Sequence, residues 1–297
     1  MRNLLHKIST LRNHPQPIAF IFLKIFGSAF ARNFFSIKRN GYKLSLENNE
    51  LTLALFHQGK NSYRGIEILL EGLLKKGDSF IDIGGSIGPH SIYAKKIVKH
   101  GSVVMVEPMP EMIETALKNF NLNNVSVKLV PLAISNDSGT LEMANLEGRS
   151  YIHNDKLKNN LADSSTIIDK KNFSNKIKNK LTIDSCTLDS ITEKLDHISL
   201  IKVDTEGAEL IAIKSGINTL KKTNSYLVGL FNPYTTLRFG YEACDIANFL
   251  IENGFHHAYK MSGTVELALT PLDMPNEKFD TPDYYLFSKK DRLSLVD

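Results

Sequence analysis

FIDIGGSIG, which spans Phe80–Gly88, joins a short apolar run to three closely spaced glycines. An apolar run of this length, bounded by turn residues, is typical of a buried strand. The glycines let the backbone turn tightly and approach a ligand, and the helical periodicity from Pro89 predicts a helix whose first N–H groups face that turn. The stretch therefore predicts a strand, a ligand-binding turn and a helix in immediate succession.

On both sides of this stretch, short apolar runs alternate with segments of helical periodicity. This alternation is the signature of a doubly wound, mostly parallel α/β sheet of the Rossmann-like type. The expected strands are 79–83, 102–106, 125–130, 200–203, 225–231 and 284–288. The expected helices are 64–75, 89–99, 111–122, 209–215 and 241–253. Upstream, residues 35–56 alternate loosely around Asn40-Gly41, which predicts short antiparallel strands.

The composition is that of a globular chain. Of 297 residues, 42% are hydrophobic and 23% are charged, so the chain can bury a core and is not mainly disordered. Two cysteines, Cys186 and Cys244, are too few for a disulfide scaffold or a cysteine-rich zinc site and fit a reducing, cytoplasmic compartment. We expect a basic N-terminal extension over 1–62 and an α/β domain over 63–290, with an insertion at 147–184.

Positive charge is concentrated at the N-terminus. Eight of the 36 basic residues precede Glu47, the first acidic residue, so the remaining chain carries 28 − 32 = −4. Residues 17–31 are apolar, but they contain Lys24 and are too short for a membrane span, and they do not fit a cleaved signal. Within 18–37, phenylalanines at 22, 26, 30 and 34 share one helical face. This face suits packing against the domain or a second subunit; peripheral contact with an anionic membrane and an organelle transit peptide are the alternatives.

Two acidic residues indicate which ligand the glycine turn binds. Asp82 lies in the strand end before the glycines, where a carboxylate repels pyrophosphate but pairs with an ammonium group. Glu107 ends the next strand, 25 residues later, where an acid accepts hydrogen bonds from the two hydroxyls of a ribose. A nucleoside with a cationic amino-acid tail satisfies both, and S-adenosylmethionine is such a ligand. The sequence has no GxxxxGK[ST] motif that would cradle the phosphates of ATP.

Five segments in the right order resemble the FkbM family of class I S-adenosylmethionine-dependent methyltransferases: DIGGSIG, VVMVEPMPEM, LVPLAIS, TLDSI and LIKVDTEGAEL. The resemblance covers about 64–287. It implies a cofactor site at Asp82, Gly84, Gly85, Ser86, Gly88, Glu107, Pro108, Met109, Leu132 and Ala133. The chain departs from the family pattern at Gly85-Ser86, in place of a commoner Ala-Asn, and at Thr205, where an apolar residue is usual. The acid that many members carry before Asn232-Pro233 is missing.

The same resemblance places an acidic block, Asp204, Glu206, Gly207 and Glu209, at the end of the fourth parallel strand. Methyl transfer requires alignment of the nucleophile with the methyl group, and a hydroxyl nucleophile benefits from a general base or a metal. Asp204 is the first candidate for orienting the acceptor or accepting its proton, and Glu206 is the second. Glu209 is interpreted as a helix cap and His90 as structural. We expect no transition metal; Mg²⁺ held by Asp204 and Glu206 is a less favoured alternative.

Two segments are candidates for acceptor specificity. The insertion at 147–184 is rich in Asn and Lys and is interpreted as a solvated loop with some helix, or alternatively as a lid that favours an acidic partner. The loop 231–241 offers Asn232, Tyr234 and Arg238 for substrate binding, a combination that suits a sugar or an acidic glycan.

The predicted function is O-methylation of a hydroxyl on a sugar, glycolipid, glycan or secondary metabolite, with S-adenosylmethionine as cofactor. The alternatives are an NAD-dependent dehydrogenase and a non-catalytic binding protein. No RNA-binding motif accompanies the basic charge, so we expect no nucleic-acid partner.

Overall fold

The computed structural model describes residues 36–47, 55, 63–146, 149–153, 180–263, 266–274 and 276–291. Most of the phenylalanine-rich segment at 18–37 and most of the insertion at 147–184 lie outside these residues. Among the described residues, no helix is both long and apolar enough to span a bilayer. The division of the chain between residues 62 and 63 stays a prediction.

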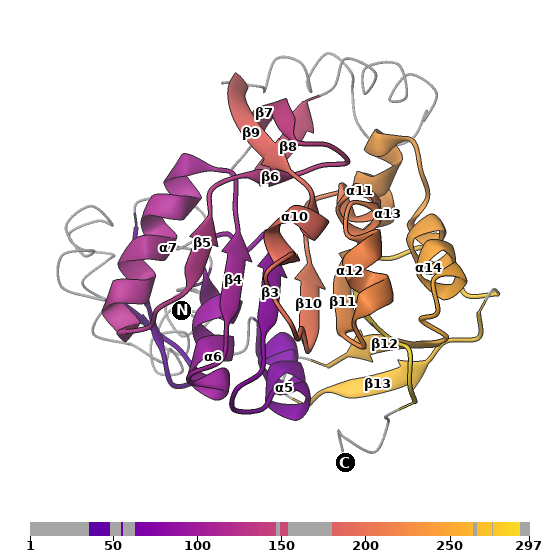
Figure 1. Cartoon of the computed structure of the whole chain (residues 1–297), viewed down its shortest axis with the longest axis horizontal. Helices are drawn as coiled ribbons and strands as arrows, with labels where there is room; N and C mark the ends of the chain where they lie inside the picture. Colours follow the sequence, from indigo (N-terminus) through magenta and orange to yellow (C-terminus); the bar gives the residue numbers. More distant parts are fainter. Residues whose placement is uncertain are drawn as a thin grey trace, which may run out of the picture.

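An eight-stranded sheet forms the centre of the molecule (Figure 1). In spatial order its strands are β13 (Ala268–Pro271), β12 (His257–Ser262), β14 (Asp283–Ser288), β11 (Tyr226–Phe231), β10 (Leu200–Val203), β3 (Phe80–Ile83), β4 (Val103–Val106) and β5 (Lys128–Val130). The five strands from β11 to β5 are parallel, and the three at the other edge pair antiparallel. The mostly parallel, doubly wound α/β fold is therefore confirmed, whereas β12 and β13 were not predicted.

Successive side chains of each central strand point to opposite faces of the sheet, and helices cover both faces. In β3, Ile81 and Ile83 pack in a core with α11 (Glu209–Lys214) and α14 (Ala243–Glu252). Phe80, on the opposite face, packs with α5 (Arg64–Leu73) and α6 (Pro89–Val98). A parallel strand buried on both faces needs a nearly continuous apolar run, which is the pattern that the sequence shows.

The predicted helices are present, and local signals explain where several of them begin. Proline occupies the first position of α6 and of α7 (Pro110–Asn123), where its missing N–H costs no hydrogen bond. A capping box formed by Glu242 and Asp245 starts α14. The shorter helices are α10 (Leu188–Thr192), α12 (Ile217–Lys222), α13 (Pro233–Thr236) and the 3₁₀ turn η2 (Leu237–Phe239).

A second, four-stranded sheet lies at the top of Figure 1. It consists, in spatial order, of β6 (Ala133–Ile134), β9 (Lys180–Cys186), β7 (Gly139–Leu146) and β8 (Arg149–His153). β8 and the start of β9 belong to the insertion, so the prediction of a loop with some helix was wrong for 149–153 and 180–184. These segments are extended because β7 pairs with both of them. Such pairing joins distant segments and is not visible in an Asn- and Lys-rich composition.

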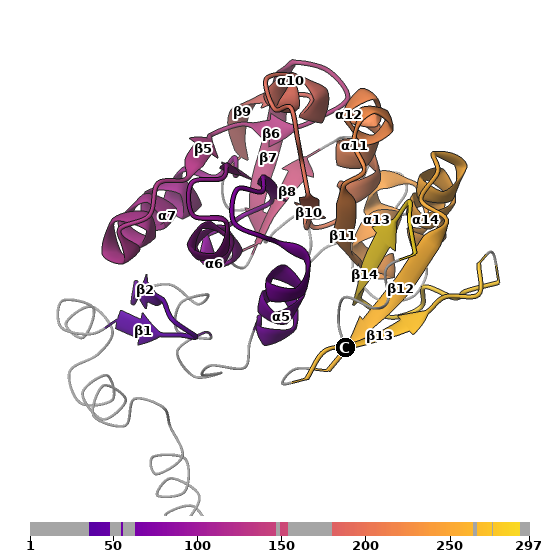
Figure 2. The same cartoon turned by 60° about the horizontal axis from the view of Figure 1, so that its bottom comes forward.

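The predicted antiparallel hairpin consists of β1 (Ser36–Lys38) and β2 (Lys43–Ser45) and lies beside α6 and α7, apart from the central sheet (Figure 2). Two asparagines of α7 hold it. Asn119 Oδ1 accepts a hydrogen bond from the Ser45 N–H at 2.7 Å, and Asn123 exchanges hydrogen bonds with the backbone of Lys43 at 2.9 and 2.6 Å. Asn119 Nδ2 also donates to the carbonyl oxygen of Ile87 at 2.9 Å, so α7 connects the hairpin to the glycine turn.

An ion pair is buried in the middle of the central sheet. Lys202 in β10 and Asp82 in β3 are register partners on adjacent strands, and Lys202 Nζ lies 3.1 Å from Asp82 Oδ1. The two side chains are 1% and 0% exposed. Burial by itself would raise the pKa of Asp82, but the Lys202 charge and a hydrogen bond from Ser91 hold this pKa below its ordinary value. The pair is therefore ionised on both sides.

We expect Asp82→Ala to lower the free energy of unfolding by about 3–5 kcal/mol, because it removes the nearest counter-charge of a buried ammonium group. A double variant, Asp82→Leu with Lys202→Met, removes both charges and should recover most of that loss. Urea denaturation at pH 7 measures the unfolding free energy of both variants. A double variant as unstable as Asp82→Ala would contradict this account of the pair.

Candidate active site

The carboxyl ends of three adjacent parallel strands form one edge of the central sheet. The last residues of β4, β3 and β10 are register partners, so the residues that follow them, Glu107, Gly84 and Asp204, stand side by side. The chain continues from β3 to β4 on one side, while β10 lies on the other. Open α/β sheets bind ligands at such a point, where the strand order reverses.

A pocket of about 300 Å³ opens at this edge. Polar and acidic residues line it together with one glycine: Gly84, Ser86, Glu107, Asp204, Thr205 and Glu206. Apolar residues also line it, among them Val106, Pro108, Met112, Leu132, Ala133, Ile134 and Met143. Tyr63 also lines the pocket. A mostly apolar cavity with a few converging polar groups is typical of a small-molecule site.

The glycine turn lies so close to β10 that only glycine fits at its first position. Gly84 has a φ of +72°, and a Cβ there would lie 1.9 Å from the carbonyl oxygen of Asp204. Ser86, with a φ of +52°, also lines the pocket. Gly85 and Gly88 do not line it; a Cβ on Gly88 would lie 2.6 Å from the ring of Phe120 in α7. Two of the four predicted residues of the turn therefore face the pocket, and the other two allow the turn to pack.

Glu107 lines the pocket, and two backbone N–H groups hold its carboxylate. Ser86 N–H donates to Oε2 at 2.8 Å and Met109 N–H donates to Oε1 at 3.0 Å. Each oxygen has a further lone pair with which it can accept a hydrogen bond from a ligand hydroxyl. Burial raises the pKa of Glu107 to about 7 in spite of these hydrogen bonds, so the group titrates near neutral pH. Pro108 lines the pocket, whereas Met109 contributes its backbone to the anchor.

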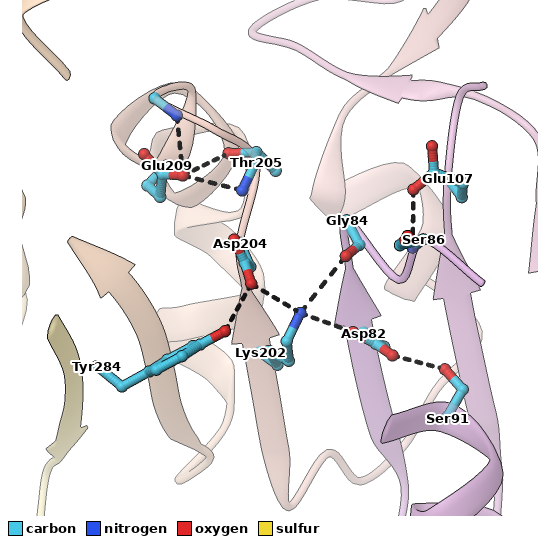
Figure 3. Close-up of polar contacts among 11 residues, drawn as sticks. Asp82, Gly84, Ser86, Ser91, Glu107, Lys202, Asp204, Thr205, Glu209 and Tyr284 are labelled. Carbon is cyan, nitrogen blue, oxygen red and sulfur yellow. Dashed lines mark hydrogen bonds and ion pairs between the residues drawn. The ribbon is translucent and has the colours of Figure 1, made fainter. Parts of the chain in front are cut away.

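Asp82 takes a different place from the one expected. We predicted that its carboxylate pairs with the ammonium group of a ligand, but Asp82 is fully buried and does not line the pocket. Its Oδ1 faces Lys202, and its Oδ2 accepts a hydrogen bond from the Ser91 hydroxyl at 2.7 Å (Figure 3). A lysine of the protein already supplies the ammonium group. The prediction that Asp82 binds the ligand directly is therefore corrected: Asp82 supports the site from beneath the pocket.

Asp204, the first catalytic candidate, lines the pocket and has two partners in the described structure (Figure 3). The Tyr284 hydroxyl, from β14, donates to Asp204 Oδ2 at 2.7 Å, and Lys202 Nζ lies 3.7 Å from the same oxygen. Burial, followed by the negative charge of Asp204, raises the pKa of Tyr284 well above its ordinary value, so the phenol remains a donor. Both partners engage Oδ2, and Oδ1 is the oxygen left for a pocket ligand.

The other acids of the block have separate positions. Glu206, the second catalytic candidate, lines the pocket and has a φ of +55°, a strained conformation that is often found at functional sites. Glu209 does not line the pocket. Its Oε1 accepts hydrogen bonds from the N–H groups of Thr205 and Gly207 at 2.9 and 3.1 Å, and burial raises its pKa to about 7. These contacts match the interpretation of Glu209 as a capping residue that shapes the loop carrying Asp204 and Glu206.

The three residues predicted to bind substrate do not line this pocket. Asn232 Oδ1 accepts a hydrogen bond from the Tyr234 N–H at 3.0 Å and so caps α13, while the Tyr234 side chain is exposed. Arg238 lies in η2. A polar side chain beside a helix start can bind the backbone locally, and the loop composition does not distinguish this from ligand binding.

His90 is buried, and its ring meets the ring of Tyr63 edge-on at 4.9 Å between centroids. Burial, followed by the charge of Lys202, lowers the pKa of His90 to about 3, so the imidazole is neutral and packs as part of the core. No group of three or more His, Cys, Asp and Glu side chains in the described part of the chain is arranged to hold a metal ion.

Sequence reasoning missed three residues of the site: Lys202, Tyr284 and Tyr63. Lys202 carried a detectable signal, because a lone charge inside the buried strand LIKV requires a partner on an adjacent strand. The two tyrosines carried no such signal. Tyr63 precedes α5 with a φ of +73°, and Tyr284 lies in the last described strand, so only the fold brings them to Asp204.

The chain is similar to many solved structures, among them two methyltransferases. The methyltransferase FkbM from Methylobacillus flagellatus is 17% identical, with a TM-score of 0.43 over 80% of this chain and 53% of that one. The precorrin-6y C5,15-methyltransferase from Geobacter metallireducens is 14% identical, with a TM-score of 0.42 over 78% of this chain and 90% of that one.

Sequence comparison gives the family. Among curated proteins, the methyltransferase sdnD from Sordaria araneosa is 27% identical in an alignment of 155 residues that covers 45% of this chain and 58% of the relative. The chain thus spans little more than half the length of that relative. A family model described as "Methyltransferase FkbM domain" matches residues 82–261, which is more than half of the chain. The chain therefore belongs to the FkbM family of S-adenosylmethionine-dependent methyltransferases.

Proposed function

We propose that the protein transfers the methyl group of S-adenosylmethionine to a hydroxyl group on a sugar, glycolipid, glycan or secondary metabolite. The observation that carries the proposal is the Asp204 carboxylate, which lines the pocket while Tyr284 and Lys202 hold its Oδ2. Family membership supports the methyl donor, and a carboxylate in this position supports an acceptor that must lose a proton.

The residues of the pocket fit this cofactor. The Glu107 carboxylate would accept hydrogen bonds from the ribose hydroxyls, and the apolar side chains of Leu132 and Met143 would contact the adenine. The backbone of Gly84 and Ser86 would hold the methionine part. When bound, the cofactor supplies a methyl group on a positively charged sulfur. Asp82 supports this arrangement indirectly, because it fixes Lys202, whose Nζ lies 3.5 Å from the Gly84 carbonyl oxygen.

Asp204 is the group that we assign to the acceptor hydroxyl. Its Oδ1 would accept the hydroxyl proton, while the phenol of Tyr284 and the ammonium of Lys202 stabilise Oδ2 and fix the plane of the carboxylate. A positioned general base typically contributes ~10²–10⁴-fold to a rate. Glu206, on the same loop, would orient a second polar group of the acceptor.

Charge at the pocket favours a neutral acceptor. Glu107, Asp204 and Glu206 are acidic, and no lysine, arginine or histidine is among the described lining residues. A phosphate, sulfate or carboxylate placed beside Asp204 would meet like charge in a partly buried site, where Coulomb repulsion is stronger than in water. Within the proposed acceptors, a neutral sugar or another polyol therefore fits better than the acidic glycan suggested by the loop 231–241.

We expect a neutral hydroxyl compound to accept labelled methyl when the protein is incubated with methyl-labelled S-adenosylmethionine and a panel of sugars, polyols, glycolipids and acidic glycans. Asp204→Asn should lower turnover by roughly 100-fold or more, because it removes the proton acceptor. Calorimetry with S-adenosylhomocysteine should give wild-type affinity for this variant. Full turnover by Asp204→Asn, or transfer to acidic glycans alone, would contradict the proposal.

Replacing Tyr284 by Phe should lower kcat about tenfold or more with little change in KM, because the Asp204 carboxylate loses a charge-assisted hydrogen bond. Tyr285→Phe is the matched control. This neighbour is fully buried, stacks on Phe231 at 5.2 Å between centroids, and has no hydrogen-bond partner for its hydroxyl in the described structure. Steady-state kinetics on the acceptor found in the screen compares the two. If Tyr284→Phe and Tyr285→Phe changed kcat equally, Tyr284 would contribute to packing only.

The affinity for S-adenosylhomocysteine should rise about tenfold between pH 6 and pH 8. The pKa of Glu107 is raised to about 7, so the carboxyl is mostly protonated at pH 6 and mostly ionised at pH 8, and the ionised form is the better acceptor for ribose hydroxyls. Glu107→Gln should bind more weakly and lose this pH dependence. Calorimetric titrations of both proteins measure the effect; a pH dependence that persists in Glu107→Gln would assign it to another group, such as Glu209.

A further inference from the structure

A second hollow, remote from the pocket, is rich in lysine. It has a volume of about 350 Å³ and lies where the hairpin meets the last turns of α6 and α7. Lys38 and Lys43 line it from the hairpin, Lys96 from α6, and Leu122 and Asn123 from α7. Figure 2 shows this part of the molecule at the lower left, with β1 and β2 beside α6 and α7.

The residues that line the hollow include three lysines and Arg39. No aspartate or glutamate is among the described residues that line it. Lys96 Nζ donates to the carbonyl oxygen of Gly41, which holds this ammonium at the rim. Burial lowers the pKa of Lys96, and the nearby charges of Lys99 and Lys43 lower it further. Clustered cations of this kind attract an anion, because it relieves their mutual repulsion.

The backbone around Lys43 is fixed by hydrogen bonds that do not use the Lys43 ammonium group. Asn123 binds both the N–H and the carbonyl oxygen of Lys43, and Asn119 binds the N–H of Ser45. Lys43 therefore contributes its backbone to the fold and leaves its exposed side chain for a partner. Recognition groups on regular elements are held more precisely than groups on loops.

Two observations point to a lipid surface as the source of the anion. Leu122, at the rim of the hollow, is 44% exposed, so an apolar side chain stands next to the lysines. In sequence, the hairpin directly follows a stretch that has basic residues, no acidic residue and phenylalanines at 22, 26, 30 and 34. Basic and apolar side chains together suit an anionic membrane, where lysine contacts phosphate groups and apolar groups contact acyl chains. A free phosphate ion would bind the lysines but would gain nothing from the neighbouring apolar side chains.

We propose that this lysine hollow docks on an anionic lipid surface by binding the phosphate groups of lipid headgroups. The interaction is independent of the pocket, which lies at the opposite, carboxyl end of the parallel strands. It would bring the protein to a membrane while the pocket stays open to the acceptor.

Sedimentation of the full-length protein with vesicles tests the proposal. We expect binding to vesicles of phosphatidylglycerol and phosphatidylcholine, little binding to phosphatidylcholine alone, and a steep loss of binding as salt is raised from 0.05 to 0.5 M, because screening weakens the lysine–phosphate attraction. Inorganic phosphate without vesicles is the second probe. Equal binding to both vesicle types, or binding of inorganic phosphate with no vesicle binding, would overturn the proposal.

Variants assign the binding to the hollow. The double variant Lys43→Ala/Lys96→Ala should weaken binding to the anionic vesicles roughly 30-fold, from the usual effect of two lysines at an anionic surface. Lys43→Glu alone should weaken it as well, and this side chain is not part of the hydrogen-bonded frame. The matched control is Lys221→Ala/Lys222→Ala, which removes two exposed lysines of α12 on the opposite side of Figure 2. The contact would lie elsewhere if the control variant lost as much vesicle binding as the hollow variants. It would also lie elsewhere if the hollow variants kept both their thermal stability and their full vesicle binding.

Discussion

The buried ammonium of Lys202 holds the centre of this structure together. It lies between two carboxylates, 3.1 Å from Asp82 Oδ1 and 3.7 Å from Asp204 Oδ2, and it links the two strands between which the strand order reverses. Without the Lys202 ammonium, the negative charges of Asp82 and Asp204 would be poorly compensated, because both faces of the sheet are apolar. The lysine thus lets the chain keep one acidic group, Asp82, buried in the sheet and another, Asp204, in the lining of the pocket.

The ends of β3, β4 and β10 each contribute a different part of the pocket next to this lysine. The turn after β3 brings backbone within contact distance of β10, since Gly84 leaves no room for a side chain. The residue after β4 is Glu107, whose carboxylate is anchored by backbone N–H groups and is buried enough to titrate near pH 7. The residue after β10 is Asp204. The short segments that follow the three strands therefore supply the proposed cofactor contacts and the catalytic candidate, while the strands themselves stay regular.

Parts of the chain outside the family-matched segment complete the site. Tyr284 comes from β14 and binds Asp204, and Tyr63 comes from the residue before α5 and lines the pocket. The hairpin is connected to the glycine turn through Asn119, which binds Ser45 on one side and Ile87 on the other. Asn119 thus holds the hairpin and the glycine turn in fixed positions relative to each other.

The sequence by itself determined the order of the parallel strands and of the helices between them, the glycine turn, and the row of residues at the carboxyl edge. These features follow from local patterns, because the spacing of apolar residues indicates which faces are buried and where each strand ends. Only the tertiary structure decided that Asp82 faces Lys202 rather than a ligand and that Tyr284 holds Asp204. Those contacts depend on strand order and register between segments up to 120 residues apart, which a local pattern does not encode.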